Sequence, residues 1–122
     1  MNMRYSIATV LSVALFFGYT GCAVAHASLV HSNPIASAVL ETPPPSVQLR
    51  FSSPIETAFS AVRVVDQNNT EVNTGKPAAP DGDRRNLKVT LPPLASGTYK
   101  VMWRIVAKDG HKMTGEYAFT VQ

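Results

Sequence analysis

Asp109 and His111, separated only by Gly110, are residue types whose spacing suits metal chemistry. A carboxylate and an imidazole two positions apart can point the same way, and glycine lets the backbone turn tightly between them. Such a pair makes half of a metal site. Alone it is a weak signal, because Asp-Gly is common in hairpin turns and a histidine after it is usually only solvated.

His26 offers the other half, because the residues before it have the features of a secretory signal. A short segment with one charge, Arg4, precedes the apolar run IATVLSVALFF at positions 7–17. The sequence AVA at 23–25 then places small residues at the −3 and −1 positions of a signal-peptidase cut. The pattern predicts a cleaved signal peptide over residues 1–25 and one domain over 26–122.

Two other interpretations of the leader remain open. An uncleaved anchor would need most of residues 7–25, a stretch barely long enough to span a bilayer. Its second half, GYTGCAVA, is small and polar, which favours cleavage. Lipoprotein processing at Cys22 would require a leucine-like residue three positions earlier, where the chain has Tyr19.

A cut after residue 25 makes His26 the first residue, so its α-amine and its imidazole Nδ1 can close a chelate on one ion. The α-amine has a pKa of about 7.7–8.0 in unstructured peptides, so a metal displaces its proton at little cost near neutral pH. With Asp109 and His111 the donors become one amine, two imidazoles and one carboxylate. Nitrogen and oxygen donors in a tetragonal array suit Cu(II). Zinc accepts the same donors but prefers a tetrahedral arrangement.

Composition sets limits on the rest of the chain. Removing 25 of the 122 residues leaves 97, enough for one hydrophobic core. The formal charge falls from +3 to +2 with the loss of Arg4, too mild for nucleic-acid binding. The single cysteine, Cys22, lies in the leader, so the exported domain must be stabilised by packing rather than by disulfides.

The elements that must position these residues are strands, because apolar and polar residues alternate with a period of two. Clusters of Pro, Gly, Asn and Asp separate the alternating segments, whereas residues 71–83 show no alternation and are expected to form a surface loop. About seven short antiparallel strands are expected, in a sandwich or barrel. Six of them are located by the pattern, at residues 27–31, 47–51, 62–65, 87–91, 99–105 and 117–121.

Three segments carry a resemblance to a known family: HASLVHSNP at the start of the expected domain, VQLRFSSPIETAFSAVRVVD in the middle and PLASGTYKVMWRIVAKDGHKMTGEYAFTV at the end. They resemble the periplasmic copper-binding proteins of the CopC/YobA family over essentially the whole exported chain. The resemblance implies an all-β Greek-key β-sandwich of the Ig-like or cupredoxin-like kind. It also implies one Cu(II) ion in a histidine brace, with His26 giving amine and imidazole and Asp109 and His111 giving the remaining ligands.

One departure from the family concerns Cu(I). Some members carry a second site in a methionine-rich loop that includes a histidine. The corresponding residues here, DQNNTEVNTGKPAAPDGDRR at 66–85, contain neither methionine nor histidine. Because Cu(I) prefers soft thioether ligands, the chain resembles a Cu(II)-only member.

Other residues are weaker candidates for the site. His31 shares the strand parity of Leu29 and is expected to be partly buried rather than a ligand. Met113 is expected to fill core space beside Trp103. Glu116 is a candidate acceptor that orients a ligand. Packing is expected of Trp103 as the core anchor and of Tyr99 and Tyr117, and a surface position of Met102.

Three functions fit these observations. The first is a monomeric periplasmic carrier that buffers Cu(II), in copper homeostasis or resistance, and delivers it to a CopD-like inner-membrane protein, as the resemblance implies. The second is a histidine-brace copper oxygenase, although Asp109 would then occupy a position that an oxygen species needs. The third is a metal-free interaction module, which leaves a processed N-terminal histidine unexplained. We expect the carrier, not an enzyme.

Overall fold

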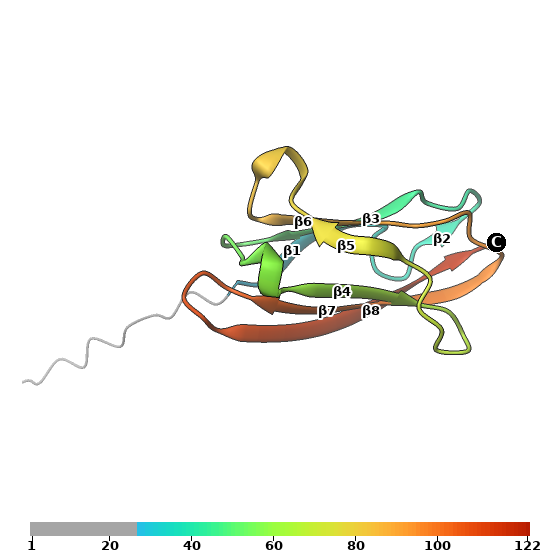
Figure 1. The fold of residues 1–122 in the computed structure, drawn as a ribbon. Coiled ribbons are helices and arrows are strands. Elements are labelled where there is room, and N and C mark those ends of the chain that lie inside the picture. Colours follow the sequence, from blue (N-terminus) through green and yellow to red (C-terminus); the bar gives the residue numbers. More distant parts are fainter. Residues whose placement is uncertain (1–26) are drawn as a thin grey trace, which may run out of the picture.

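The computed structural model describes residues 27–122, so the expected signal peptide and His26 lie outside the described part. Two four-stranded sheets face each other in a β-sandwich, as the alternation and the resemblance predict (Figure 1). One sheet has the order β1-β3-β6-β5 and the other β2-β8-β7-β4. The strands are β1 (Leu29–Asn33), β2 (Val39–Leu40), β3 (Ser46–Phe51), β4 (Ala61–Val65), β5 (Thr74–Ala78), β6 (Asn86–Thr90), β7 (Gly97–Val106) and β8 (Lys112–Val121).

Two short 3-10 helices, η1 (Thr57–Phe59) and η2 (Pro80–Gly82), complete the fold. Within residues 27–122 no helix has the length and apolar character needed to cross a membrane.

The core lies between the sheets and follows the alternation that the sequence shows. In β3, Val47, Leu49 and Phe51 are almost fully buried, whereas Gln48 and Arg50 are exposed. Val101 and Ile105 of β7 and Phe119 of β8 face them from the opposite sheet. Burial of each side chain of this size contributes roughly 1.5–3 kcal/mol to the stability of the fold. Apolar packing can therefore hold the two sheets together without a covalent link.

Trp103 occupies a more specific position than a general core anchor. It is only partly buried, and its ring makes an edge contact with Phe51 (centroids 6.5 Å apart) and a tilted one with Tyr117 (6.1 Å). The indole covers Gly115, its partner in the β7–β8 register, where an added Cβ would overlap the ring. The expectation that Tyr99 packs in the sheet is confirmed, since it stacks on Phe119 with centroids 5.6 Å apart.

Three sequence expectations about the strands are wrong. The expected loop over residues 71–83 contains strand β5, which pairs with β6 through an irregular register. The strands are not all antiparallel, because the short β2 pairs in parallel with β8. His31 is exposed, because a bulge after Leu29 shifts the register with β3 and turns Ser32, not His31, towards the core.

β4 is the last strand of its sheet, and the side chain of Asn73 forms hydrogen bonds with its outer edge. The N–H of Val64 donates to Oδ1 of Asn73 at 2.8 Å, and Nδ2 of Asn73 donates to the carbonyl of Val62 at 3.3 Å. The N–H of Val72 also donates to the carbonyl of Val64 at 2.8 Å. Since an unpaired edge is a template for association, this amide protects the edge from another chain.

Candidate metal centre

The hairpin of β7 and β8 carries Asp109 and His111 at its tip. The two strands pair without a register shift up to Val106 and Lys112. In the turn the N–H of Ala107 donates to the carbonyl of His111 at 2.8 Å, and the N–H of Gly110 to the carbonyl of Ala107 at 2.9 Å. Gly110 has a φ of 89°, the left-handed region that the sequence analysis expected glycine to permit here.

The turn brings the two predicted ligands into direct contact. Nδ1 of His111 lies 2.8 Å from Oδ2 of Asp109, and the N–H of His111 donates to Oδ1 at 3.0 Å. Both side chains are close to half exposed, at 48% and 44%, so an ion can reach them from solvent. A carboxylate against one ring nitrogen fixes the orientation of an imidazole.

The described chain begins at the same end of the sandwich. Ala27 is fully buried, and the next residue, Ser28, is held by the loop that follows β3. The N–H of Ser28 donates to Oγ of Ser52 at 2.9 Å, and the N–H of Ser52 donates to the carbonyl of Ser28 at 2.8 Å. Figure 1 shows the first described residues beside the tip of the β7–β8 hairpin.

The loop at residues 52–56 joins this N-terminal segment to the hairpin. The N–H of Lys108 donates to the carbonyl of Pro54 at 3.3 Å, and Ile55 forms an isolated bridge with Ala107. The N–H of Glu56 donates to the carbonyl of Val106 at 2.7 Å. Ser28 and the turn residues are therefore connected through five residues of backbone at one end of the sandwich.

The same loop is anchored from its other side by the segment before β6. The N–H of Ile55 donates to the carbonyl of Arg84 at 2.9 Å, and the Arg84 guanidinium pairs with Glu56 at 2.9 Å. The loop is therefore held by residues that are distant from it in sequence, and its position does not depend on its connection to β3 alone.

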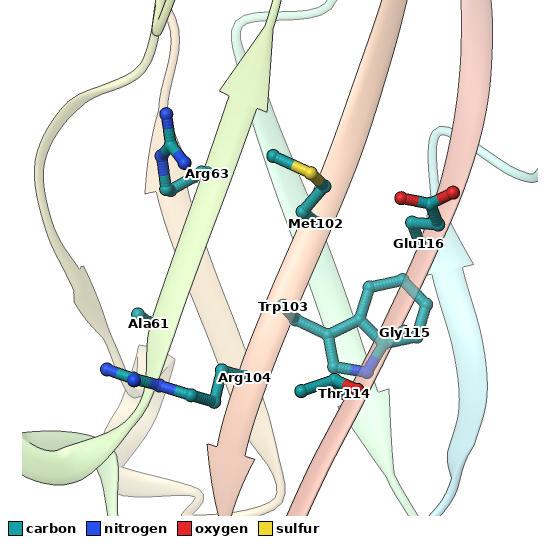
Figure 2. Close-up of a pocket in the computed structure, with 8 residues that line it drawn as sticks. All are labelled: Ala61, Arg63, Met102, Trp103, Arg104, Thr114, Gly115 and Glu116. Carbon is teal, nitrogen blue, oxygen red and sulfur yellow. The ribbon is translucent and has the colours of Figure 1, made fainter.

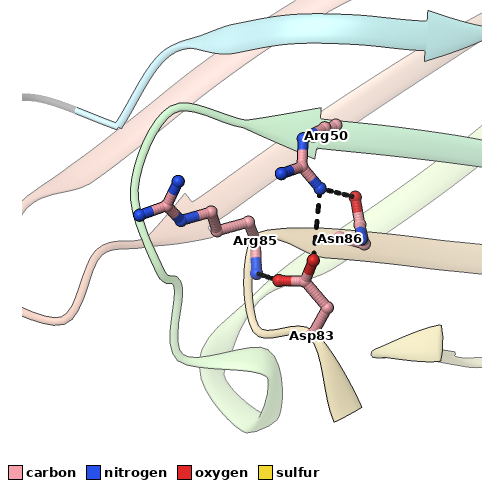
Figure 3. A network of polar contacts seen from close by, with 4 residues as sticks. All are labelled: Arg50, Asp83, Arg85 and Asn86. Carbon is pink, nitrogen blue, oxygen red and sulfur yellow. Dashed lines mark hydrogen bonds and ion pairs between the residues drawn. The ribbon is translucent and has the colours of Figure 1, made fainter. Parts of the chain in front are cut away.

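A polar network stabilises this segment, as Figure 3 shows. Asp83 accepts from the N–H of Arg85 at 3.0 Å and from the Arg50 guanidinium at 3.2 Å, and Arg50 also donates to Asn86 at 3.3 Å. The bond from the Arg85 backbone, then that from the Arg50 side chain, lower the pKa of Asp83 below its ordinary value. The network stays charged at neutral pH and ties the end of β3 to the start of β6.

The described residues supply only two of the predicted ligands. No group of three or more His, Cys, Asp or Glu side chains that could hold a metal occurs within residues 27–122. The third predicted ligand residue, His26, precedes Ala27 directly and lies outside the described residues.

The weaker candidates lie elsewhere. Met113 packs against the core, as expected. Glu116 lies opposite Met102 in the β7–β8 register. It is four residues beyond Lys112 along β8. At about 3.3 Å per residue this is roughly 13 Å, so Glu116 is too far away to orient His111. Met102 lies on the outer face, as expected.

Comparison with known proteins gives consistent matches. The family model described as CopC domain matches residues 29–122. Protein YobA of Escherichia coli strain K12 is 35% identical over 122 residues, covering 99% of this chain and 95% of YobA. The crystal structure of CopC from Methylosinus trichosporium OB3b has a TM-score of 0.74 and 33% identity, covering 80% of this chain and 94% of that one. The structure of PcoC, described as a methionine-rich copper resistance protein from Escherichia coli, has a TM-score of 0.69 and 34% identity, covering 80% and 100%.

Proposed function

The chain belongs to the CopC family, and on that premise we propose that it carries one Cu(II) ion in the periplasm. The ligands are the α-amine and imidazole of His26, exposed by removal of residues 1–25, together with Asp109 and His111. One observation carries the proposal: loop 52–56 hydrogen-bonds both to Ser28 and to the turn that holds Asp109 and His111. The described chain therefore begins at the end of the sandwich that carries the turn, which supports the assignment of His26 as a ligand.

The donor types favour Cu(II) over other ions. Amine, imidazole and carboxylate groups match the tetragonal nitrogen and oxygen sets that Cu(II) takes, and Cu(II) heads the divalent affinity series. The ligands must lose protons to bind, so affinity falls as the pH drops through the range of the imidazoles and the amine. Zinc is the competitor that the same donors would accept.

A second site for Cu(I) lacks suitable ligands. PcoC is described as methionine-rich, whereas this chain has only Met102 and Met113 after residue 26. Met102 lies on the outer face and Met113 packs against the core. Residues 66–85 contribute no thioether. The protein therefore binds copper in one oxidation state and does not move it between two sites of its own.

Carriage rather than catalysis is the role that the site supports. Asp109 would fill a coordination position that a copper oxygenase keeps for oxygen. A carrier needs a recipient, and the family resemblance implies a CopD-like protein of the inner membrane. Buffering and delivery of Cu(II) are parts of copper homeostasis or resistance.

A pair of proteins tests the proposal directly. One begins at His26, and the other carries one additional residue before it, so that the amine is displaced but the imidazole remains. Each is titrated with Cu(II) and examined by EPR, with Zn(II) as competitor. The extension is expected to lower Cu(II) affinity by several orders of magnitude.

The control is His31→Ala, which removes an exposed histidine of β1 and is expected to leave binding unchanged. Equal binding by the natural and extended proteins would show that His26 forms no chelate. Turnover of peroxide by the copper-loaded protein would instead favour the oxygenase.

A further inference from the structure

The candidate metal turn is bordered by positive charge. Lys108 and Lys112 stand immediately before and after the sequence Asp109-Gly110-His111, and both are exposed. Arg104 follows on the outer face of the same hairpin, opposite Thr114. Within residues 27–122 no acidic partner is found for these three cations.

An exposed aromatic ring lies beside this charge. Phe59 of η1 is 71% exposed, the largest value among the large hydrophobic side chains of the described chain. With Arg104, Val106 and Lys112 it lines a hollow of about 300 Å³. In protein interfaces a few aromatic and arginine side chains supply most of the affinity, and an exposed phenylalanine beside Arg104 and Lys112 fits such a surface.

A second hollow continues the surface along the outer face of β4, β7 and β8. It measures about 540 Å³ and shares Arg104 with the first. Figure 2 shows Arg63, Met102 and Arg104 on neighbouring strands around it. Arg63 pairs with Glu71 at 3.2 Å, and Glu116 is the single acid in the lining. The lining consists of Ala61, Arg63, Met102, Trp103, Arg104, Thr114, Gly115 and Glu116.

We propose that this outer face, from Lys112 and Phe59 to Met102, docks an acidic protein segment that carries an apolar side chain. The apolar side chain contacts Phe59 and Val106, and its acidic neighbours pair with Lys112 and Arg104. A copper carrier must transfer its ion to another protein, so this proposal rests on the proposed function. A partner that contacts Lys112 lies next to His111, because Lys112 follows His111 directly in the sequence.

The shape of the face favours a protein segment over a lipid surface. Two hollows that share Arg104 can receive a projecting chain, whereas a bilayer needs a convex or flat apolar surface. Opposite charge also increases the rate of encounter and orients the partner before contact. The effect depends on salt, with a screening length of about 8 Å at physiological ionic strength.

A synthetic peptide of glutamates flanking one leucine is the probe, titrated calorimetrically into the metal-free protein that begins at His26. Using metal-free protein keeps docking separate from copper binding, which is titrated independently. Lys112→Glu is expected to lower peptide affinity about tenfold, through loss of one attraction and gain of one repulsion. Phe59→Ser is expected to lower it by a similar factor, about tenfold, by removing the apolar contact.

Lys88→Glu is the matched control, because Lys88 is an exposed strand residue of the opposite sheet and its reversal changes net charge equally. It is expected to change affinity by less than about twofold. Circular dichroism confirms that each variant folds. Absence of peptide binding, or equal losses in Lys112→Glu and Lys88→Glu, would overturn the proposal. Binding of phosphatidylglycerol vesicles that depends on Lys112 and Phe59, with no binding of the peptide, would assign the face to a lipid surface instead.

Discussion

A single carboxylate holds both the ring and the backbone of His111. Oδ2 of Asp109 lies 2.8 Å from Nδ1 of His111, and Oδ1 accepts the N–H of His111 at 3.0 Å. Both contacts are made within one turn, so the histidine is oriented before an ion arrives. The two residues are therefore expected to have separable effects on metal binding: His111 would offer an imidazole donor, and Asp109 would fix that donor as well as offer an oxygen.

His111→Ala is expected to weaken Cu(II) binding more than Asp109→Asn does. The alanine variant loses one nitrogen donor outright. The asparagine variant keeps an oxygen that accepts the His111 N–H but loses the charge, and a loss of about 10–100-fold is expected. Cu(II) titration measures both affinities, and EPR is expected to show a changed spectrum for Asp109→Asn.

Neither variant is expected to alter the β-sheet signal in circular dichroism, since both side chains are nearly half exposed. An unchanged affinity for His111→Ala would remove His111 from the site. An identical EPR spectrum for Asp109→Asn would reduce Asp109 to a turn residue.

Ser52→Ala tests the connection between the N-terminal segment and the hairpin. The Ser52 hydroxyl accepts the N–H of Ser28 at 2.9 Å and contacts its hydroxyl at 3.2 Å. Without it the segment before β1 is held less firmly, and Cu(II) affinity is expected to fall several-fold, in line with a net hydrogen-bond contribution of about 1 kcal/mol. Ser53→Ala is the control, and equal affinities for the two variants would show that this bond does not position His26.

Asn73→Ala is expected to uncover the edge of β4. The substitution removes both amide contacts with Val62 and Val64 and leaves a part-buried N–H and carbonyl without partners, at a cost of about 1–3 kcal/mol. Urea unfolding measures the loss of stability, and light scattering is expected to detect association through the exposed edge. Asn68→Ala, which alters the preceding loop, is expected to do neither. A monomeric Asn73→Ala protein of natural stability would contradict the role given to this amide.

The buried Tyr117 hydroxyl is expected to make the free energy of unfolding depend on pH in the alkaline range. Burial raises the pKa of Tyr117 from 10.0 to about 12, and the nearby Ser32 hydroxyl offsets a part of this. Between these values the native state retains a proton that the unfolded state has lost, so stability falls as the pH rises from 10 towards 12. Below pH 10 both states are protonated and the effect vanishes.

Tyr117→Phe is expected to remove this part of the alkaline loss. Its hydroxyl is buried and has no partner with hydrogen-bond geometry within the described residues, although Ser32 lies near enough to lower its pKa. The substitution is therefore expected to change stability at neutral pH by no more than about 1 kcal/mol. Urea midpoints for both proteins at about pH 9 and about pH 11 measure the difference in slope. The same decline in both proteins would exclude Tyr117 as its cause.

The sequence predicts the long central strands because their burial alternates, and it fails where alternation is absent. β3, β7 and β8 are recognisable from side chains such as Leu49, Val101 and Phe119. β5 is mostly exposed and contains Gly75 and Pro77, so its pairing with β6 leaves no apolar pattern. The prediction for His31 fails for a different reason. The bulge after Leu29 reverses which of the following residues in β1 face the core.

The contact between the two proposed turn ligands is predictable from sequence because it is local, whereas their surroundings are not. Asp109 and His111 interact within three residues, and spacing alone suggests the pair. Nothing in the sequence near His26 indicates that Ser52 holds the following segment, because that contact spans 24 residues. The docking face is assembled from η1 and the outer side of the hairpin, and Phe59 becomes recognisable only once its exposure is known.

The last strand of the described chain, β8, is an interior one. β8 lies between β2 and β7, and its pairing with β7 extends over the full length of both strands. A nascent chain that ends before Lys112 has no strand to join β2 to its sheet and no counterpart for Trp103. The sheet that holds β2, β7 and β4 is therefore expected to stay incomplete until β8 has been synthesised.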